Sequence, residues 1–174
     1  MRELVLYALR MGSERIILGD CRGDEVGELL RAMSNGYSGS LLNVYATSPR
    51  ASLTHLETMA LANGVQPAVK LLRTQLAGAL QVIVYLARLQ DGTRKVLNIL
   101  EVQGFDGVSL KLQSIFHFRN AGFDAPSGKV EGDFEASGFS PTFLSRFEAS
   151  SIRLAAEMFT CPQSSYAQSP QNRV

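Results

Sequence analysis

A change of hydrophobic period near residue 80 is the feature that most constrains the fold of this 174-residue chain. Before it, short apolar runs alternate with segments in which apolar residues recur every three or four positions. That alternation of strands and helices is typical of an α/β layer with parallel strands. After it, apolar residues recur at every second position, as in half-exposed antiparallel strands. We therefore predict an α/β part followed by a small antiparallel β-meander and a C-terminal helix.

The first part predicts two strands, 15–19 and 41–46, each a short and continuous apolar run. Such runs are typical of parallel strands that helices cover on both faces. The Leu and Met residues that recur at helical spacing are expected in the core, and so is Tyr45 inside the second strand. The expected helices are an amino-terminal one with Leu4, Ala8 and Met11 at helical spacing, then 24–34, 48 to about 63–64, and 67–80.

The second part predicts short strands joined by turns. A strand rich in β-branched residues ends before Asp91-Gly92, which is a strong hairpin signal. Apolar and polar residues then alternate strictly over 108–113, which predicts a half-exposed strand that ends near Phe118. Residues 119–139 favour a Gly-rich loop or a short extended segment. Ser140-Pro141 favours the start of the last helix.

Composition limits the function classes. Seventeen Lys and Arg residues balance sixteen Asp and Glu, and no block of like charge stands out, which argues against nucleic acid as a partner. No apolar stretch approaches the roughly 20 residues of a bilayer-spanning helix, and the first residues do not resemble a signal peptide. Two cysteines, Cys21 and Cys161, fit a reducing compartment rather than a disulfide scaffold. We expect a soluble cytoplasmic protein.

Five segments resemble, in order, the motifs of one family of motor proteins. Residues 9–23 (LRMGSERIILGDCRG) are similar to the Walker B region of the hexameric ATPases of type II and type IV secretion and pilus assembly. The other segments resemble the histidine box of that family, at 32–41 and 44–50, and its ending, at 113–118 and 137–143. The sequence is most similar to the CpaF, or TadA-type, branch, which drives tight-adherence pili in bacteria.

The resemblance implies a partial RecA-like P-loop NTPase core, from the Walker B strand onward, that uses ATP and Mg²⁺ in a homohexamer. It places Asp20 at the Walker B acidic position, where the carboxylate would hold Mg²⁺ through water. Arg22 falls on the neighbouring catalytic arginine, and Arg10 and Gly23 are the implied nucleotide-binding residues. The implied partners are inner-membrane secretion or pilus platform proteins, or an intact homologous secretion ATPase, at the cytoplasmic side of the inner membrane.

Departures from the family pattern bear on activity. No G-x-x-x-x-G-K-[ST] loop occurs in the sequence, and Gly128-Lys129 does not qualify because Val130 follows it. The sequence therefore predicts the back half of a motor domain, without the amides and the lysine that hold phosphates. Asp20 stands where the branch has Glu, so its carboxylate reaches less far. Tyr37 and Tyr45 replace the two histidines of the histidine box, and tyrosine is a poor proton carrier near neutral pH.

Each site residue also has a plain structural interpretation. Asp20 and Arg22 would form an ion pair at the end of a strand, and Arg10 would be solvated. Tyr37 would be a loop aromatic that packs on the edge of the core. The remaining candidates are interpreted as structural: His55, His117, and Cys21 in a small buried slot.

Three functions stay open at this point. The chain is an ATPase half that does not hydrolyse ATP alone, a half-enzyme that a P-loop chain completes in trans, or a non-enzymatic module that regulates a secretion motor. The expected domains are 1–118 for the ATPase part, 119–160 for a family-specific segment, and 161–174 for a disordered tail. Because a parallel sheet without its first strands leaves apolar side chains uncovered, we expect the isolated chain to self-associate.

Overall fold

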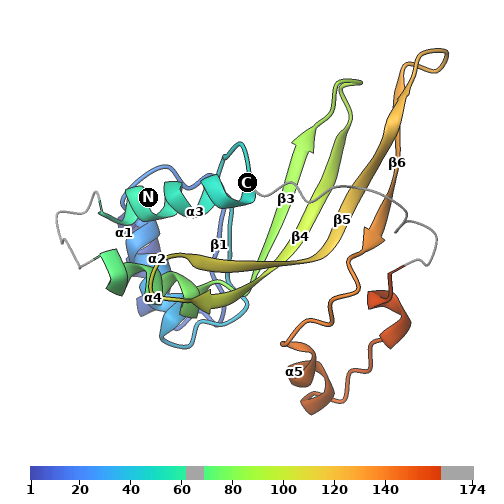
Figure 1. Cartoon of the computed structure of the whole chain (residues 1–174). Helices are drawn as coiled ribbons and strands as arrows, with labels where there is room; N and C mark the ends of the chain where they lie inside the picture. Colours follow the sequence, from blue (N-terminus) through green and yellow to red (C-terminus); the bar gives the residue numbers. More distant parts are fainter. Residues whose placement is uncertain (62–68, 162–174) are drawn as a thin grey trace. The chain divides into compact units, whose positions relative to one another are not determined.

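The structure, a computed structural model, describes residues 1–61 and 69–161 (Figure 1). The predicted helix boundaries at 63–64 and 67 lie outside the described residues, as does the predicted tail beyond Cys161. Within the described ranges, no helix combines the length and the apolar character that crossing a membrane requires.

The chain divides into two compact units. Unit 1 consists of residues 1–85 and 102–112, and unit 2 of residues 86–101 and the chain from 113 onward. The helices are α1 Arg2–Arg10, α2 Glu25–Ser34, α3 Pro49–Leu61, α4 Val69–Ala79 and α5 Leu144–Ala149, with a 3-10 helix η1 at Ala156–Phe159. The strands are β1 Ile17–Leu18, β2 Leu41–Leu42, β3 Val82–Arg88, β4 Arg94–Phe105, β5 Leu110–Asp124 and β6 Lys129–Ala136.

The core of unit 1 is aliphatic and is centred on α2. This helix packs against α1, α3 and α4, and its residues Val26 and Leu29 are completely buried. Its apolar residues recur at the predicted spacing. The helix ends before the predicted stop at Asn35-Gly36, where Gly36 adopts a φ of +112° that other residues rarely reach.

Strands β1 and β2 pair in parallel, with Ile17 opposite Leu41 and Leu18 opposite Leu42. This pairing, next to the helices, confirms an α/β arrangement. The prediction that both strands are buried on both faces is wrong, because Ile17 is 76% exposed and Leu41 is 61% exposed while Leu18 is buried. Successive side chains of a strand point to opposite faces. The described residues therefore cover only one face of this two-stranded ladder.

Further core predictions for unit 1 are wrong for the same reason. Helix α1 forms as predicted, but the side chain that it buries is Val5, whereas Leu4 and Met11 are mostly exposed. Tyr45, expected in the core, lies outside β2 and is 68% exposed. Apolar spacing identifies a helix or a strand, but it does not tell which of its faces a neighbour covers.

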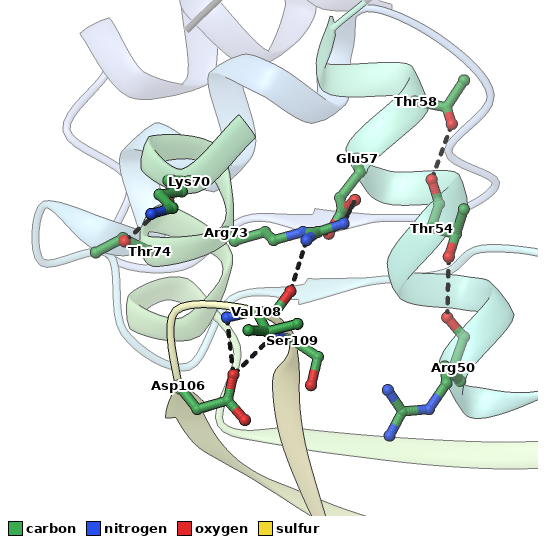
Figure 2. Close-up of polar contacts among 10 residues, drawn as sticks. All are labelled: Arg50, Thr54, Glu57, Thr58, Lys70, Arg73, Thr74, Asp106, Val108 and Ser109. Atoms are coloured by element: carbon green, nitrogen blue, oxygen red, sulfur yellow. Dashed lines mark hydrogen bonds and ion pairs between the residues drawn. The ribbon is translucent and has the colours of Figure 1, made fainter. Parts of the chain in front are cut away.

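A polar contact joins two helices of unit 1 to the turn between β4 and β5 (Figure 2). The Arg73 guanidinium of α4 donates to both carboxylate oxygens of Glu57 on α3, at 2.8 and 3.1 Å, and to the carbonyl oxygen of Val108 at 2.7 Å. Within the turn, the Asp106 carboxylate accepts the backbone amides of Val108 and Ser109. The planar fork of one arginine thus fixes three segments relative to one another.

Strands β3 to β6 form one sheet in sequential order, which is the order of the predicted meander. Strands β5 and β6 are antiparallel. Of the two alternatives for 119–139, the loop is wrong and the extended segment is closer, because β5 continues past the predicted end near Phe118 to Asp124 and β6 occupies Lys129–Ala136. The turn between them is tight, since the Gly128 amide donates to the Asp124 carbonyl oxygen at 2.8 Å and Gly128 has a φ of +66°.

A buried carboxylate and a small apolar cluster organise unit 2. Glu101 on β4 is only 3% exposed and accepts the backbone amide of Thr142 at 3.1 Å and its hydroxyl at 2.5 Å. The last helix, predicted to begin at Ser140-Pro141, begins instead at Leu144, after this contact. Among the described residues, the buried apolar side chains of unit 2 are Ile115, Val130, Ala136 and Phe159.

Candidate functional site

The loop that follows β1 holds the predicted Walker B residue. Next to it, the Asn43 amide donates to the Leu18 carbonyl oxygen at 3.0 Å, and the Cys21 amide donates to the Asn43 carbonyl oxygen at 2.8 Å. These bonds continue the pairing of the two parallel segments past the ends of β1 and β2. Asp20 therefore lies at the carboxyl end of β1, with a φ of +63°. That left-handed conformation is uncommon for a residue other than glycine, although Asp is among those that tolerate it.

Asp20 and Arg22 form a two-pronged ion pair. Arg22 Nε donates to Asp20 Oδ1 at 2.7 Å, and Arg22 Nη2 lies 2.6 Å from Asp20 Oδ2. The hydrogen bond from Arg22 to Asp20, together with the charge of that carboxylate, raises the pKa of Arg22. The side chains are 42% exposed for Asp20 and 74% for Arg22. An ion pair this exposed contributes little to stability.

Glu25, at the start of α2, makes a contact with the candidate loop that sequence reasoning missed. It is 5% exposed, and its Oε1 accepts the backbone amides of Arg22 at 2.8 Å and of Gly23 at 3.2 Å. Burial raises the pKa of Glu25, but the amides of Arg22, Glu25 and Gly23 outweigh burial and lower it. The sequence indicated only that an acid suits the first turn of a helix. Its contact with the preceding loop depends on the loop's conformation.

Cys21 lies between the two members of the ion pair but points into the core. It is 3% exposed, which confirms the predicted small buried slot. Burial raises the pKa of the Cys21 thiol to about 11. The thiol is therefore protonated at neutral pH and is a poor nucleophile or metal ligand.

The two tyrosines of the histidine-box segments differ in their surroundings. The half-buried Tyr37 donates its hydroxyl to the carbonyl oxygen of Leu9 at 3.3 Å, as expected of a loop aromatic on the core edge. Tyr45 projects into solvent, and its carbonyl oxygen lies 3.0 Å from Nδ1 of His55. For that contact to be a hydrogen bond, Nδ1 carries the proton and donates. His55 thus contacts the backbone of a histidine-box segment, and its predicted structural role stays a prediction.

Arg10 and Gly23 occupy different parts of unit 1. Arg10 ends α1, with its guanidinium carbon 6.0 Å from the centre of the Tyr7 ring. Among the described residues, no hydrogen bond or ion pair joins Arg10 to the Asp20 loop. Gly23 does belong to that loop, and a Cβ at this position would lie 3.2 Å from Glu25 Oε2. Of the predicted site residues, the structure brings together Asp20, Arg22 and Gly23.

These residues do not by themselves fit ATP with Mg²⁺. The Asp20 carboxylate already accepts two contacts from Arg22, and the amides of Arg22 and Gly23 already donate to Glu25. In the part of the chain that the structure describes, no three His, Cys, Asp or Glu side chains gather as a metal site requires. The loop supplies one carboxylate and one guanidinium at a strand end, fewer groups than a phosphoryl-transfer site requires.

Comparison with known proteins identifies the family. A Mycobacterium tuberculosis protein named for conjugal transfer is 36% identical over 107 residues, which cover 62% of this chain and 30% of that protein. The type IV secretion system protein PtlH of Bordetella pertussis is 31% identical over 101 residues, which cover 56% of this chain and 30% of that protein. The chain thus spans about a third or less of the length of the relatives that it matches.

A solved structure and a family match complete the comparison. The crystal structure of the VirB11 ATPase from the Brucella suis type IV secretion system, in complex with sulphate, is similar with a TM-score of 0.53 and 28% identity. The similar region covers 57% of this chain and 32% of VirB11. The family described as "Type II/IV secretion system protein" matches residues 1–129, a range that includes Asp20, Tyr37 and Tyr45. This chain therefore belongs to the type II/IV secretion system protein family.

Proposed function

We propose that this chain forms the Walker B and histidine-box part of a secretion ATPase site and does not hydrolyse ATP by itself. The observation that carries the proposal is the Asp20–Arg22 pair, held at the carboxyl end of a parallel strand in a chain of the secretion family. In this proposal Asp20 is the acidic residue of the site and Arg22 is its cationic partner. Both act only when another polypeptide segment supplies the phosphate-binding loop.

The chemistry of phosphate binding supports the need for that segment. No G-x-x-x-x-G-K-[ST] sequence occurs in these 174 residues. Such a loop presents a series of backbone amides and a lysine to the β- and γ-phosphates. Of the amides that follow Asp20, that of Cys21 donates to the Asn43 carbonyl oxygen, and those of Arg22 and Gly23 donate to Glu25. The proposal is the same whether the loop belongs to the same polypeptide or to a different one.

The uncovered face of the β1–β2 ladder supports completion by further protein. Ile17 and Leu41 lie opposite each other on that face and are both largely exposed. Parallel sheets are almost always covered on both faces, because their apolar side chains otherwise remain in water. A segment that adds a neighbouring strand and covers this face would also bring its groups close to Asp20.

The two tyrosines favour weakened nucleotide sensing. The hydroxyl of Tyr37 is used in a contact with the end of α1. Tyr45 is exposed, but a tyrosine hydroxyl near neutral pH offers a neutral donor where histidine can carry a positive charge. In a completed site, these two positions therefore contribute less to charge stabilisation than histidines would.

The finer assignment is to the CpaF type, and it rests on the motif resemblance. On this assignment the completed ATPase powers assembly of tight-adherence pili, works as a hexamer or joins an intact homologous ATPase, and meets platform proteins at the inner membrane. The conjugal transfer and PtlH relatives support the broader secretion role.

Two measurements test the proposal. The purified chain, titrated with a fluorescent ATP analogue and Mg²⁺, is expected to bind more weakly than about 10 μM, roughly −7 kcal/mol. Co-expression with the P-loop-bearing part of a homologous secretion ATPase is expected to give a complex that hydrolyses ATP. Asp20→Asn should abolish that turnover, whereas Glu14→Gln, an exposed acid just before β1, should leave it unchanged.

The same measurements can contradict the proposal. ATP turnover by the chain alone, lost in Asp20→Asn, would show that the site is complete without a further loop. A complex that turns over ATP equally well with the parent chain and with the Asp20→Asn variant would show that Asp20 has no part in the site. If the chain instead binds only an intact secretion ATPase and adds no turnover, the regulatory function is the correct one.

A further inference from the structure

We propose that Glu25 is the positioning residue of the candidate site: it determines the loop conformation in which Arg22 meets Asp20. The meaning of this role for catalysis rests on the proposed function of Asp20. The positioning role itself concerns only the conformation of this loop and does not depend on that function. Neither the family match nor the relatives assign a role to Glu25.

The contacts of Glu25 fix the loop at its backbone. A single oxygen, Oε1, accepts the amides of two successive residues, Arg22 and Gly23, at 2.8 and 3.2 Å. Two bonds that converge on one atom orient both peptide groups between Asp20 and α2. The other oxygen, Oε2, lies so near Gly23 that a Cβ there would come within 3.2 Å of it. The loop is therefore closed around this carboxylate.

The ion pair is too weak to hold this conformation alone. Asp20 and Arg22 are both well exposed, so water competes for their bonds. The left-handed backbone of Asp20 adds a cost to the same loop. Glu25, in contrast, is almost completely buried, and bonds to a buried charged acceptor are among the stronger hydrogen bonds. Because the bonds of Glu25 are stronger than the exposed ion pair, we infer that Glu25 sets the loop conformation. The ion pair between Asp20 and Arg22 then forms in that conformation.

The contact requires an acceptor rather than a charge. An amide side chain presents one oxygen of the same reach, so Glu25→Gln can keep both backbone bonds. Glu25→Ala removes both. Glu28 provides a matched control, because it is an acid on the same helix that pairs with Arg2 and Arg31 rather than with the loop.

The experiment is ¹⁵N NMR on the whole chain in water, with Glu25→Ala, Glu25→Gln and Glu28→Gln. Hydrogen exchange is followed for the Arg22 and Gly23 amides and for the Arg22 Nε–H, which reports the ion pair and touches no atom of Glu25. Glu25→Ala is expected to speed exchange at all three groups by about tenfold or more. Glu25→Gln and Glu28→Gln are expected to leave them within about twofold of the parent.

Unchanged exchange of the Arg22 Nε–H in Glu25→Ala overturns the inference, since the ion pair would then form without Glu25. An acceleration of exchange in Glu25→Gln as large as that in Glu25→Ala overturns it as well, because an acceptor oxygen would then not be enough to hold the loop. If Glu25→Ala does not fold, Glu25→Met takes its place, because methionine keeps the length of the side chain and removes the oxygen that accepts both amides; unchanged exchange of the Arg22 Nε–H in that variant overturns the inference. No nucleotide enters this experiment, so its failure is distinct from a failure of the proposed function, which the ATP titration detects.

Discussion

The two units of this protein are stabilised by different interactions. Unit 1 has an extensive aliphatic core, in which Leu29 and Leu76 are completely buried. In the described part of unit 2, few apolar side chains are buried, and polar contacts join residues that are far apart in sequence. The Asp91 carboxylate accepts the amide of Val130, 39 residues away, and Glu101 accepts that of Thr142, 41 residues away.

Because of this difference, the two units should lose stability in response to different kinds of substitution. An aliphatic core loses stability when a side chain is shortened, because a cavity remains. A unit held by a few polar contacts loses it when one donor disappears or one turn is strained. Spectroscopy can follow both units, since four of the five tyrosines lie in unit 1 and eight of the nine phenylalanines in unit 2.

The largest effect is expected from Leu29→Ala. Loss of this completely buried side chain should lower the free energy of unfolding by about 2–5 kcal/mol. Urea unfolding followed by tyrosine fluorescence should show the shift, while the near-ultraviolet bands of phenylalanine change less. Leu4→Ala, at an exposed position of α1, should cost about 0.5 kcal/mol or less. An equal shift of the tyrosine and phenylalanine signals in Leu29→Ala would contradict separate stabilisation of the units.

A smaller effect, confined to unit 2, is expected from Gly132→Ala. A Cβ on Gly132 would lie 2.3 Å from the carbonyl oxygen of Arg119 and 2.5 Å from the ring of Phe118. Because a backbone atom cannot move aside easily, the cost should reach about 3 kcal/mol, the upper part of the usual range for overpacking. The phenylalanine bands should report it. Glu131→Ala, exposed on the same strand, is the control, and an equal loss there would remove the steric explanation.

Gly132 also shows why part of the fold was not predictable from sequence. The glycines within 119–139 favoured a Gly-rich loop or a short extended segment over two regular strands, because glycine is common where the chain turns. Gly132 instead lies within β6, where the Phe118 ring takes the space of a side chain. That requirement comes from a partner strand 13 or more residues away, so no local pattern contains it. In contrast, α2 was predictable because its spacing, first turn and stop are all local.

In the candidate site, too, some features could be predicted from local sequence and others could not. The positions of Asp20, Arg22 and Gly23 after a strand followed from the motif, and the structure brings these three together. The role of Glu25 did not follow, because it depends on the left-handed turn at Asp20. The exposure of Tyr45 did not follow either, because it depends on what covers the ladder.

The buried acid of unit 2 should respond to the loss of one donor. Thr142→Val removes the hydroxyl that donates to Glu101 but keeps the backbone amide that donates to the same carboxylate. The free energy of unfolding should fall by about 1–2 kcal/mol, the lower part of the range for a buried acceptor that loses a partner. Phenylalanine circular dichroism during urea unfolding measures it. Thr142→Ser keeps a hydroxyl and should retain most of the stability; an equal loss in both variants would contradict the role of the hydroxyl.

The smallest effect concerns the acid response of the hairpin at Asp91. The amide of Val130 and the hydroxyl and amide of Thr93 donate to Asp91 and lower its pKa to about 2. A carboxyl whose pKa falls on folding contributes stability above its ordinary pKa near 3.9, and this contribution is lost as the pH falls through the lowered value. The urea midpoint of unit 2 should therefore depend on pH between about 4 and 2.

Asp91→Asn should flatten that dependence, because the amide group keeps an oxygen for Thr93 but offers Val130 no second acceptor. The midpoint above pH 4 should fall slightly toward the acid value of the parent protein. Asp133→Asn, an exposed acid on β6, removes the same charge from the same sheet and serves as the control. If Asp133→Asn flattens the pH dependence of the urea midpoint as much as Asp91→Asn does, net charge rather than the Asp91 contact controls that dependence. The Asp91 contact would then no longer support the contrast between a unit linked by polar contacts and a unit with an aliphatic core.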